Sequence, residues 1–151
     1  MELLPALAIS SSGLTAERLR LDLIANNLAN INTTRTPRGG PYRRQVPIFA
    51  EKLREAMGSG PGTGPVAGSP PDQAPGRGVE VAVIAEDNSP PRLVYDPSHP
   101  DADANGYVHL PNINIVNEMV DMITASRAYE ANVTALNAAK AMTLKALEIG
   151  R

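Results

Sequence analysis

Leucines recur every seven residues near the start of the chain. They occupy Leu7, Leu14, Leu21 and Leu28, with Ile24 and Ile31 three residues after the last two. This spacing predicts a helix over residues 6–34 with an apolar stripe of coiled-coil type. Glu17 interrupts the stripe, and Leu19 and Leu23 lie on the opposite face. We therefore expect this helix to pack on more than one side.

Three asparagines lie near the end of the predicted helix, at Asn26, Asn27 and Asn30. Asparagine is a poor helix former because its amide competes for backbone hydrogen bonds. Two interpretations follow. Either the helix ends near residue 25 in a polar turn, or the amides bond to other helices and fix their register.

A second helix is predicted over residues 112–149, which contain neither Gly nor Pro and precede Gly150. Asn112 or Asn114 is expected to cap its start. The apolar stripe alternates steps of four and three residues through Ile115, Met119, Met122, Ser126, Tyr129, Val133, Leu136, Lys140, Thr143 and Leu147. Val116, Val120 and Ile123 form a second apolar patch beside it, so this helix also needs more than one partner.

The middle of the chain, residues 35–111, differs in composition. Residues 58–76 hold six Gly and five Pro, a composition that predicts a flexible loop. Alternation and β-branched residues predict short strands at 79–83, 92–95 and 107–110. The predicted fold class is mostly α with a small β-rich insert. Its regions are an N-terminal helix (1–34), the insert (35–111) and a C-terminal helix (112–151), with the two helices forming a coiled-coil domain.

Composition excludes several function classes. The chain has 151 residues, a net charge of −2 and no Cys, which leaves no disulfide or thiolate metal site and no overall attraction to nucleic acid. No apolar run approaches the roughly 18 residues of a membrane span. Two helices with apolar residues on several faces cannot cover each other as an isolated pair. The sequence therefore favours a subunit of an assembly.

Candidate chemistry is sparse. The chain has only two histidines, His99 and His109, and the glycines at 58–76 lack the strand–loop–helix context of a phosphate site. We predict no catalytic residues and no cofactor. Residues Asp101–Gly106 match the first half of a calcium loop, but Asn112 replaces the bidentate Glu at the twelfth position. An Asx-rich turn is favoured, and a calcium-binding or other interaction module is the alternative function.

Charge is distributed unevenly along the insert. Four arginines have no acid in their own stretch: Arg35, Arg38, Arg43 and Arg44. Acids predominate over residues 78–105. The two segments either steer one subunit against another or are ordinary solvated surface.

Several motifs resemble the rod and hook axial proteins of bacterial flagella. They are Ser12-Gly13-Leu14, the run Leu23–Thr34, the segment Gly39–Arg44, the segment Tyr95–Ala102 followed by Gly106-Tyr107-Val108 and Pro111-Asn112, and Glu118–Ile123 followed by Ser126–Asn132. The resemblance implies a structural subunit of the proximal rod. Its terminal helices would line a hollow shaft that transmits torque and encloses the export channel.

The resemblance also implies partners and a site. The partners are further copies, other rod proteins, the flagellar export apparatus and the adaptor at the membrane ring. Residues 3–9 make a poor secretory signal, which fits export to the periplasmic rod without a cleaved signal peptide. We predict that Leu14, Leu21, Leu28 and Ile31 pack against Met119, Met122, Tyr129 and Val133, within one subunit or between neighbours. The remaining predicted interface residues are Asn26, Asn27, Asn30, Arg127, Asn132 and Leu136.

Overall fold

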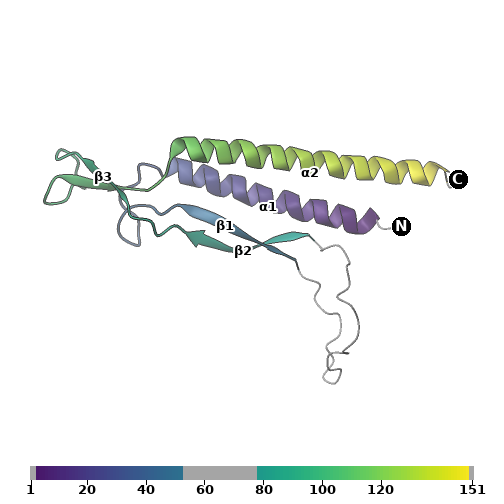
Figure 1. The fold of residues 1–151 in the computed structure, drawn as a ribbon, viewed down its shortest axis with the longest axis horizontal. Helices are drawn as coiled ribbons and strands as arrows, with labels where there is room; N and C mark the ends of the chain where they lie inside the picture. Colours follow the sequence, from purple (N-terminus) through teal and green to yellow (C-terminus); the bar gives the residue numbers. More distant parts are fainter. Residues whose placement is uncertain (1–2, 53–77, 150–151) are drawn as a thin grey trace, which may run out of the picture.

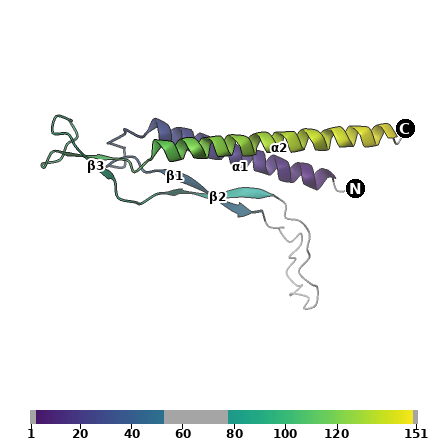
Figure 2. The ribbon, with the colours of Figure 1, turned by 45° about the horizontal axis from the view of Figure 1, so that its top comes forward.

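Two long helices lie side by side and antiparallel, with two small hairpins between them in the chain (Figures 1 and 2). The computed structural model describes residues 3–52 and 78–149, so the predicted loop at 58–76 lies outside the described residues. The elements are α1 (Leu3–Ala29), β1 (Gln45–Glu51), β2 (Val79–Glu86), β3 (Arg92–Tyr95), β4 (Tyr107–Leu110) and α2 (Ile115–Ile149). The predicted fold class is confirmed. Neither described helix combines the length and hydrophobicity of a membrane span.

Helix α1 ends at Ala29, five residues earlier than predicted. The side-chain amide of Asn30 donates to the backbone carbonyl of Asn26 (2.9 Å) and to Asn26 Oδ1 (3.0 Å). The Thr33 amide then bonds the Asn30 carbonyl, so the chain turns here. Polar side chains bonding their own backbone thus end the helix.

The start of α2 is fixed by one of the two predicted caps. Asn114 Oδ1 accepts hydrogen bonds from the amides of Val116 (2.9 Å) and Asn117 (3.4 Å). These two donors have no partner inside the helix, so the Asn114 cap satisfies them.

The buried face of α1 coincides with the predicted apolar stripe only at Ile24. Ala16, Leu23 and Ile24 are buried, whereas Leu14 and Leu21 are only half-buried. Helix α1 contacts α2 on one side and both strands of the β1–β2 hairpin on another (Figure 1). Burial therefore centres between these two neighbours and not on the four heptad leucines.

The α2 stripe is also displaced at its start. Glu118 and Ala125 are the buried residues, while Ile115 and Met119 are half exposed to solvent. The second half of the stripe is better placed, because Tyr129, Val133 and Leu136 are half-buried.

The first hairpin pairs β1 with β2 antiparallel, with a register shift between Ile48 and Phe49. Strand β2 begins where predicted and continues to Glu86, but β1 was not predicted. Pro47 and the register shift obscure the alternation by which a strand is recognised in sequence.

The second hairpin, β3–β4, matches the two predicted strands and projects beyond the helices (Figure 1). Tyr95 and Tyr107 pack edge to face across it, with ring centroids 5.3 Å apart. Gly106 has φ of +80°, and a Cβ there would lie 3.0 Å from the Tyr95 ring. A glycine is therefore required at this turn.

Candidate assembly surface and polar junction

A buried asparagine joins α1 to β1. The Asn27 side chain is 1% exposed. Its Nδ2 donates to the Gln45 carbonyl (2.9 Å), and its Oδ1 accepts from the Gln45 amide (2.9 Å). The amide thus pairs with both backbone groups of Gln45, as a neighbouring strand residue would. Of the three predicted asparagines, Asn27 bonds to other elements, whereas Asn26 and Asn30 bond to each other.

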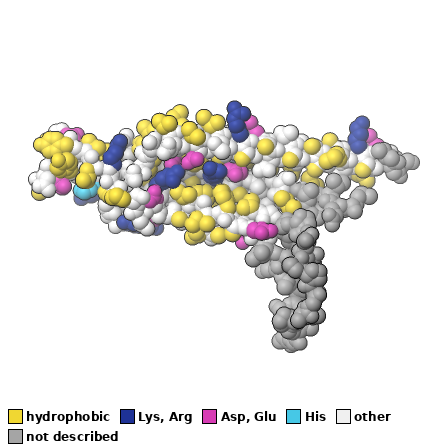
Figure 3. Space-filling model, viewed as in Figure 1, with side chains coloured by type: hydrophobic (Ala, Val, Ile, Leu, Met, Phe, Trp, Pro, Cys, Tyr) yellow, Lys and Arg dark blue, Asp and Glu magenta, His cyan; other side chains and the backbone are white. Residues whose placement is uncertain are grey.

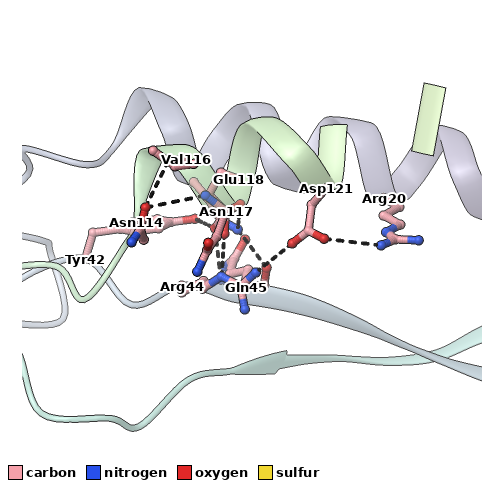
Figure 4. A network of polar contacts seen from close by, with 10 residues as sticks. Arg20, Tyr42, Arg44, Gln45, Asn114, Val116, Asn117, Glu118 and Asp121 are labelled. Atoms are coloured by element: carbon pink, nitrogen blue, oxygen red, sulfur yellow. Dashed lines mark hydrogen bonds and ion pairs between the residues drawn. The ribbon is translucent and has the colours of Figure 1, made fainter. Parts of the chain in front are cut away.

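Glu118 brings α2 into the same junction. It is 1% exposed, and its two oxygens accept from Asn27 Nδ2 (3.2 Å) and Arg44 Nε (2.5 Å). Arg44 also donates to Asp121 (3.2 Å), which lies 3.7 Å from Arg20 of α1 (Figure 4). A buried carboxylate is tolerated only when it is paired and hydrogen-bonded, and both conditions hold here. The junction therefore fixes α1, β1 and α2 relative to one another.

Tyr42 completes the junction by donating its hydroxyl to Asn27 Oδ1 (3.1 Å). Burial away from water raises the pKa of the Tyr42 phenol above its usual value of 10.0, and the negative charges of Glu118 and Glu86 raise it further. All three influences favour the neutral phenol that donates this hydrogen bond. Glu118, Arg44 and Tyr42 were absent from the predicted site. For Glu118, the one signal in the sequence was its position next to the apolar stripe of α2, where a charged residue can be buried and needs a partner.

The two terminal motifs meet farther along the helices. A Cβ on Gly13 would lie 3.0 Å from Asn132 Nδ2, so α1 approaches α2 closely at this glycine. Next to it, Ser12 Oγ donates to the Ile9 carbonyl (2.7 Å) and accepts from the Val79 amide (3.1 Å). Ser12 thereby attaches the start of β2 to α1.

The predicted interface residues fall into three groups by exposure. Asn27 is buried within the subunit, and three residues are exposed: Asn26, Met119 and Arg127. The other ten are half-buried: Leu14, Leu21, Leu28, Asn30, Ile31, Met122, Tyr129, Asn132, Val133 and Leu136. Their role between subunits stays a prediction.

An apolar ridge lies on the first turns of α2. It consists of Val116, Met119, Val120 and Ile123, whose spacing of three and four residues places them on one helix face. Each is more than half exposed, from 52% at Met119 to 67% at Val116. Hydrophobic side chains gather on this part of α2 in the space-filling view (Figure 3). A contiguous apolar face of this kind is typical of an interaction surface.

The basic and acidic segments of the insert meet inside the subunit. Arg38 donates to Glu86 (2.7 Å), Arg43 donates to Asn88 (2.6 Å), and Arg35 lies 4.0 Å from Asp101. Together with Arg44 in the junction, each of the four arginines has an intramolecular polar partner. Arg35 and Arg38 nevertheless stay more than 80% exposed, which agrees with solvated surface charge, and a role in steering one subunit against another stays a prediction.

Known proteins resemble the chain over its whole length. It is 52% identical to the flagellar basal-body rod protein FlgC of Borreliella burgdorferi, with 99% of this chain and 98% of the relative covered. It is 44% identical to the FlgC of Bacillus subtilis, with 97% of each covered, and 41% identical to that of Salmonella typhimurium, with both fully covered. The chain belongs to the FlgC family of flagellar basal-body rod proteins. Like its FlgC relatives, it is a structural subunit of the basal-body rod.

Two broader family descriptions match the regions that converge in this FlgC-family fold. "Flagella basal body rod protein" matches residues 7–35, and "Flagellar basal body rod FlgEFG protein C-terminal" matches residues 104–149. The matched regions hold both members of the close pairs Gly13–Asn132 and Asn27–Glu118.

The segment Asp101–Gly106 of this FlgC-family chain forms a turn. Asp101 Oδ2 accepts from Thr34 Oγ1 (2.7 Å), and Asp103 Oδ1 accepts from the amides of Asn105 and Tyr107 (2.9 Å each). These backbone bonds hold the pKa of the Asp103 carboxyl below its usual value. Among the described residues, no group of three His, Asp or Glu side chains is placed to hold a metal ion. Asp103 therefore makes the turn bonds that the Asx interpretation expects, whereas Asp101 bonds to Thr34 of a distant segment.

Proposed function

We propose that this chain polymerises through its two terminal helices, with further copies and other rod proteins, into a hollow proximal rod. The rod would transmit torque and enclose the export channel. The exposed ridge at Val116, Met119, Val120 and Ile123 carries this proposal. The chain has no described element that covers the ridge, and a second subunit would remove its side chains from water.

The role is structural and not enzymatic. The two histidines support this proposal, because each is engaged in a turn or hairpin. His99 Nδ1 accepts from the Asp101 amide (3.1 Å), and His109 Nε2 lies 3.7 Å from Asp103. Neither arrangement resembles a base oriented toward a nucleophile.

The specific partners and the location follow from the family. We place the chain in the periplasmic part of the basal body, delivered by the flagellar export apparatus without signal cleavage, and seated on the adaptor at the membrane ring. N-terminal sequencing of the protein from purified basal bodies tests the route. Site-specific cross-linking from exposed positions identifies the neighbours.

A charge placed on the ridge tests the assembly proposal. Val120→Asp and Met119→Asp alter exposed side chains, so the monomer should keep its helical signal in circular dichroism. Cells in which either variant is the sole copy should yield few complete rods and lose motility. Ala135→Asp is the matched control, because Ala135 is exposed on the same helix about three turns beyond Ile123 and lies to the side of the face that carries the ridge. Normal rods in both ridge variants would contradict the proposal.

A further inference from the structure

The apolar ridge on α2 is followed along the same face by two charged residues and then by several small ones. Arg127 follows Ile123 by four residues, and Glu130 comes one turn later. Beyond them, this face of the helix exposes the small residues Thr134, Ala138 and Ala141 together with Asn137. All of these residues lie on the side of α2 that is turned away from α1.

Helix α1 has an exposed face of complementary character. Arg18 and Asp22 are its charged residues, flanked on one side by Ala25, Asn26 and Ala29 and on the other by Thr15, Ser11 and Ala8. Among the described residues, none of Arg18, Asp22, Arg127 and Glu130 takes part in an ion pair. Both helices therefore offer one positive and one negative side chain to a partner.

The order of these charges selects one orientation. On each helix the positive residue comes first, so a parallel arrangement would oppose like charges. An antiparallel arrangement places Arg127 against Asp22 and Glu130 against Arg18. The two charged residues are four residues apart on α1 and three apart on α2. At a rise of about 1.5 Å per residue, these two separations differ by only about 1.5 Å.

The same register matches large residues with small ones. With Arg127 opposite Asp22, Ile123 lies opposite Asn26 and Val120 opposite Ala29. On the other side, Thr134, Ala138 and Ala141 lie opposite Thr15, Ser11 and Ala8. Small residues on both helices permit a close approach of the two backbones. The apolar ridge would then pack over the last turn of α1, where the exposed side chains are the small ones of Ala25, Asn26 and Ala29.

We propose that the outer face of α2 packs antiparallel on the outer face of α1 of a second copy, with Arg127–Asp22 and Glu130–Arg18 as the pairing charges. This inference rests on the proposed function. Within each copy α1 and α2 are antiparallel (Figure 1). When two copies point the same way, α2 of one copy is therefore antiparallel to α1 of the other, as this contact requires. Because the two faces differ, the contact is heterologous and repeats from copy to copy, as a ring or tube requires.

Charge reversal tests the pairing. Asp22→Arg and Arg127→Asp, each as the sole copy in cells, should reduce recovery of rods at least about tenfold, because like charges facing across an interface are costly. The double variant restores opposite charges and should recover to within about twofold of the unmodified chain. Single variants without effect, or a double variant as defective as the singles, would overturn the proposal.

A disulfide provides a second readout that does not depend on charge. The chain has no Cys, so Asp22→Cys with Arg127→Cys introduces the only two thiols. Oxidation of isolated rods should give a ladder of cross-linked multimers. Asp22→Cys with Lys145→Cys is the control, because the second thiol moves about 27 Å along α2. The proposal is overturned if the first pair gives no ladder or if both pairs give equal ladders.

The two hypotheses fail in distinguishable ways. If normal rods form when Met119 or Val120 is replaced by Asp, the proposed function is wrong. If those rods fail to form but the cysteine pair links the chain to another rod protein or to nothing, only the register inferred here is wrong.

Discussion

Gly13 of α1 faces Asn132 of α2 so closely that a Cβ at position 13 would lie 3.0 Å from Nδ2 of the asparagine. The next nearest atom, Asn132 Cγ, would be 3.4 Å away. A large side chain cannot enter this space unless the helices separate. The contact therefore sets the distance between the two terminal helices.

Gly13→Leu should lower the free energy of unfolding by about 1–3 kcal/mol through overpacking, although leucine favours helix more than glycine does. Urea unfolding followed by circular dichroism measures the change. Removing the opposing amide with Asn132→Ala should recover part of the loss in the double variant. Thr15→Leu, at an exposed position of α1, should have little effect. Equal losses at positions 13 and 15 would show that the close approach does not matter.

Asn27→Ala should be far more destabilising than Asn26→Ala, although the two residues are adjacent. The first change leaves the Gln45 amide, the Gln45 carbonyl and Glu118 Oε2 without their Asn27 hydrogen bonds in a buried site, at a cost of about 3 kcal/mol or more. The second removes an exposed bond to Asn30. Denaturant unfolding of both variants provides the comparison. Similar losses would mean that the junction is not the main constraint on the three elements.

Gly78→Ala should detach β2 from α1. Gly78 has φ of +111°, and a Cβ there would lie 2.1 Å from Ser12 Oγ and 3.4 Å from Ile9 Cα. We expect a loss of about 2 kcal/mol or more in unfolding free energy from backbone strain and steric clash combined. Gly39→Ala is the control, because Gly39 has φ of +85° with nothing within 4 Å of its added Cβ. It carries the backbone strain alone and should lose less stability.

The stabilisation that Tyr42 provides to the folded chain should be lost at alkaline pH. Its pKa is raised in the folded chain, so its contribution is fully present below the ordinary pKa of about 10 and is lost as the pH rises beyond it. Tyr42→Phe should cost about 1 kcal/mol at neutral pH, through the lost hydrogen bond to Asn27. The difference between the two proteins should shrink as the pH increases above about 10. A constant difference across that range would contradict the assigned pKa direction.

Local patterns in the sequence were sufficient for the elements that depend on local interactions. The heptad spacing predicted α1, and the regular apolar spacing with the absence of Gly and Pro predicted α2. The sequence offered Asn112 or Asn114 as the cap of α2, and the structure has Asn114. The strands at 92–95 and 107–110 showed ordinary strand patterns. Strand β1 was missed because Pro47 and the register shift interrupt its alternation.

The sequence by itself determined two helices with more apolar surface than they can cover for each other, because periodicity and composition are properties of the chain alone. Only the tertiary structure decided which residues of those helices are buried. The β1–β2 hairpin packs on a second side of α1, so that Ala16 and Leu23 are buried together with Ile24 of the predicted stripe, while the heptad leucines Leu14 and Leu21 are only half-buried. Asn27, Arg44 and Glu118 become one buried junction only because three elements distant in sequence converge there, and no local pattern encodes that convergence.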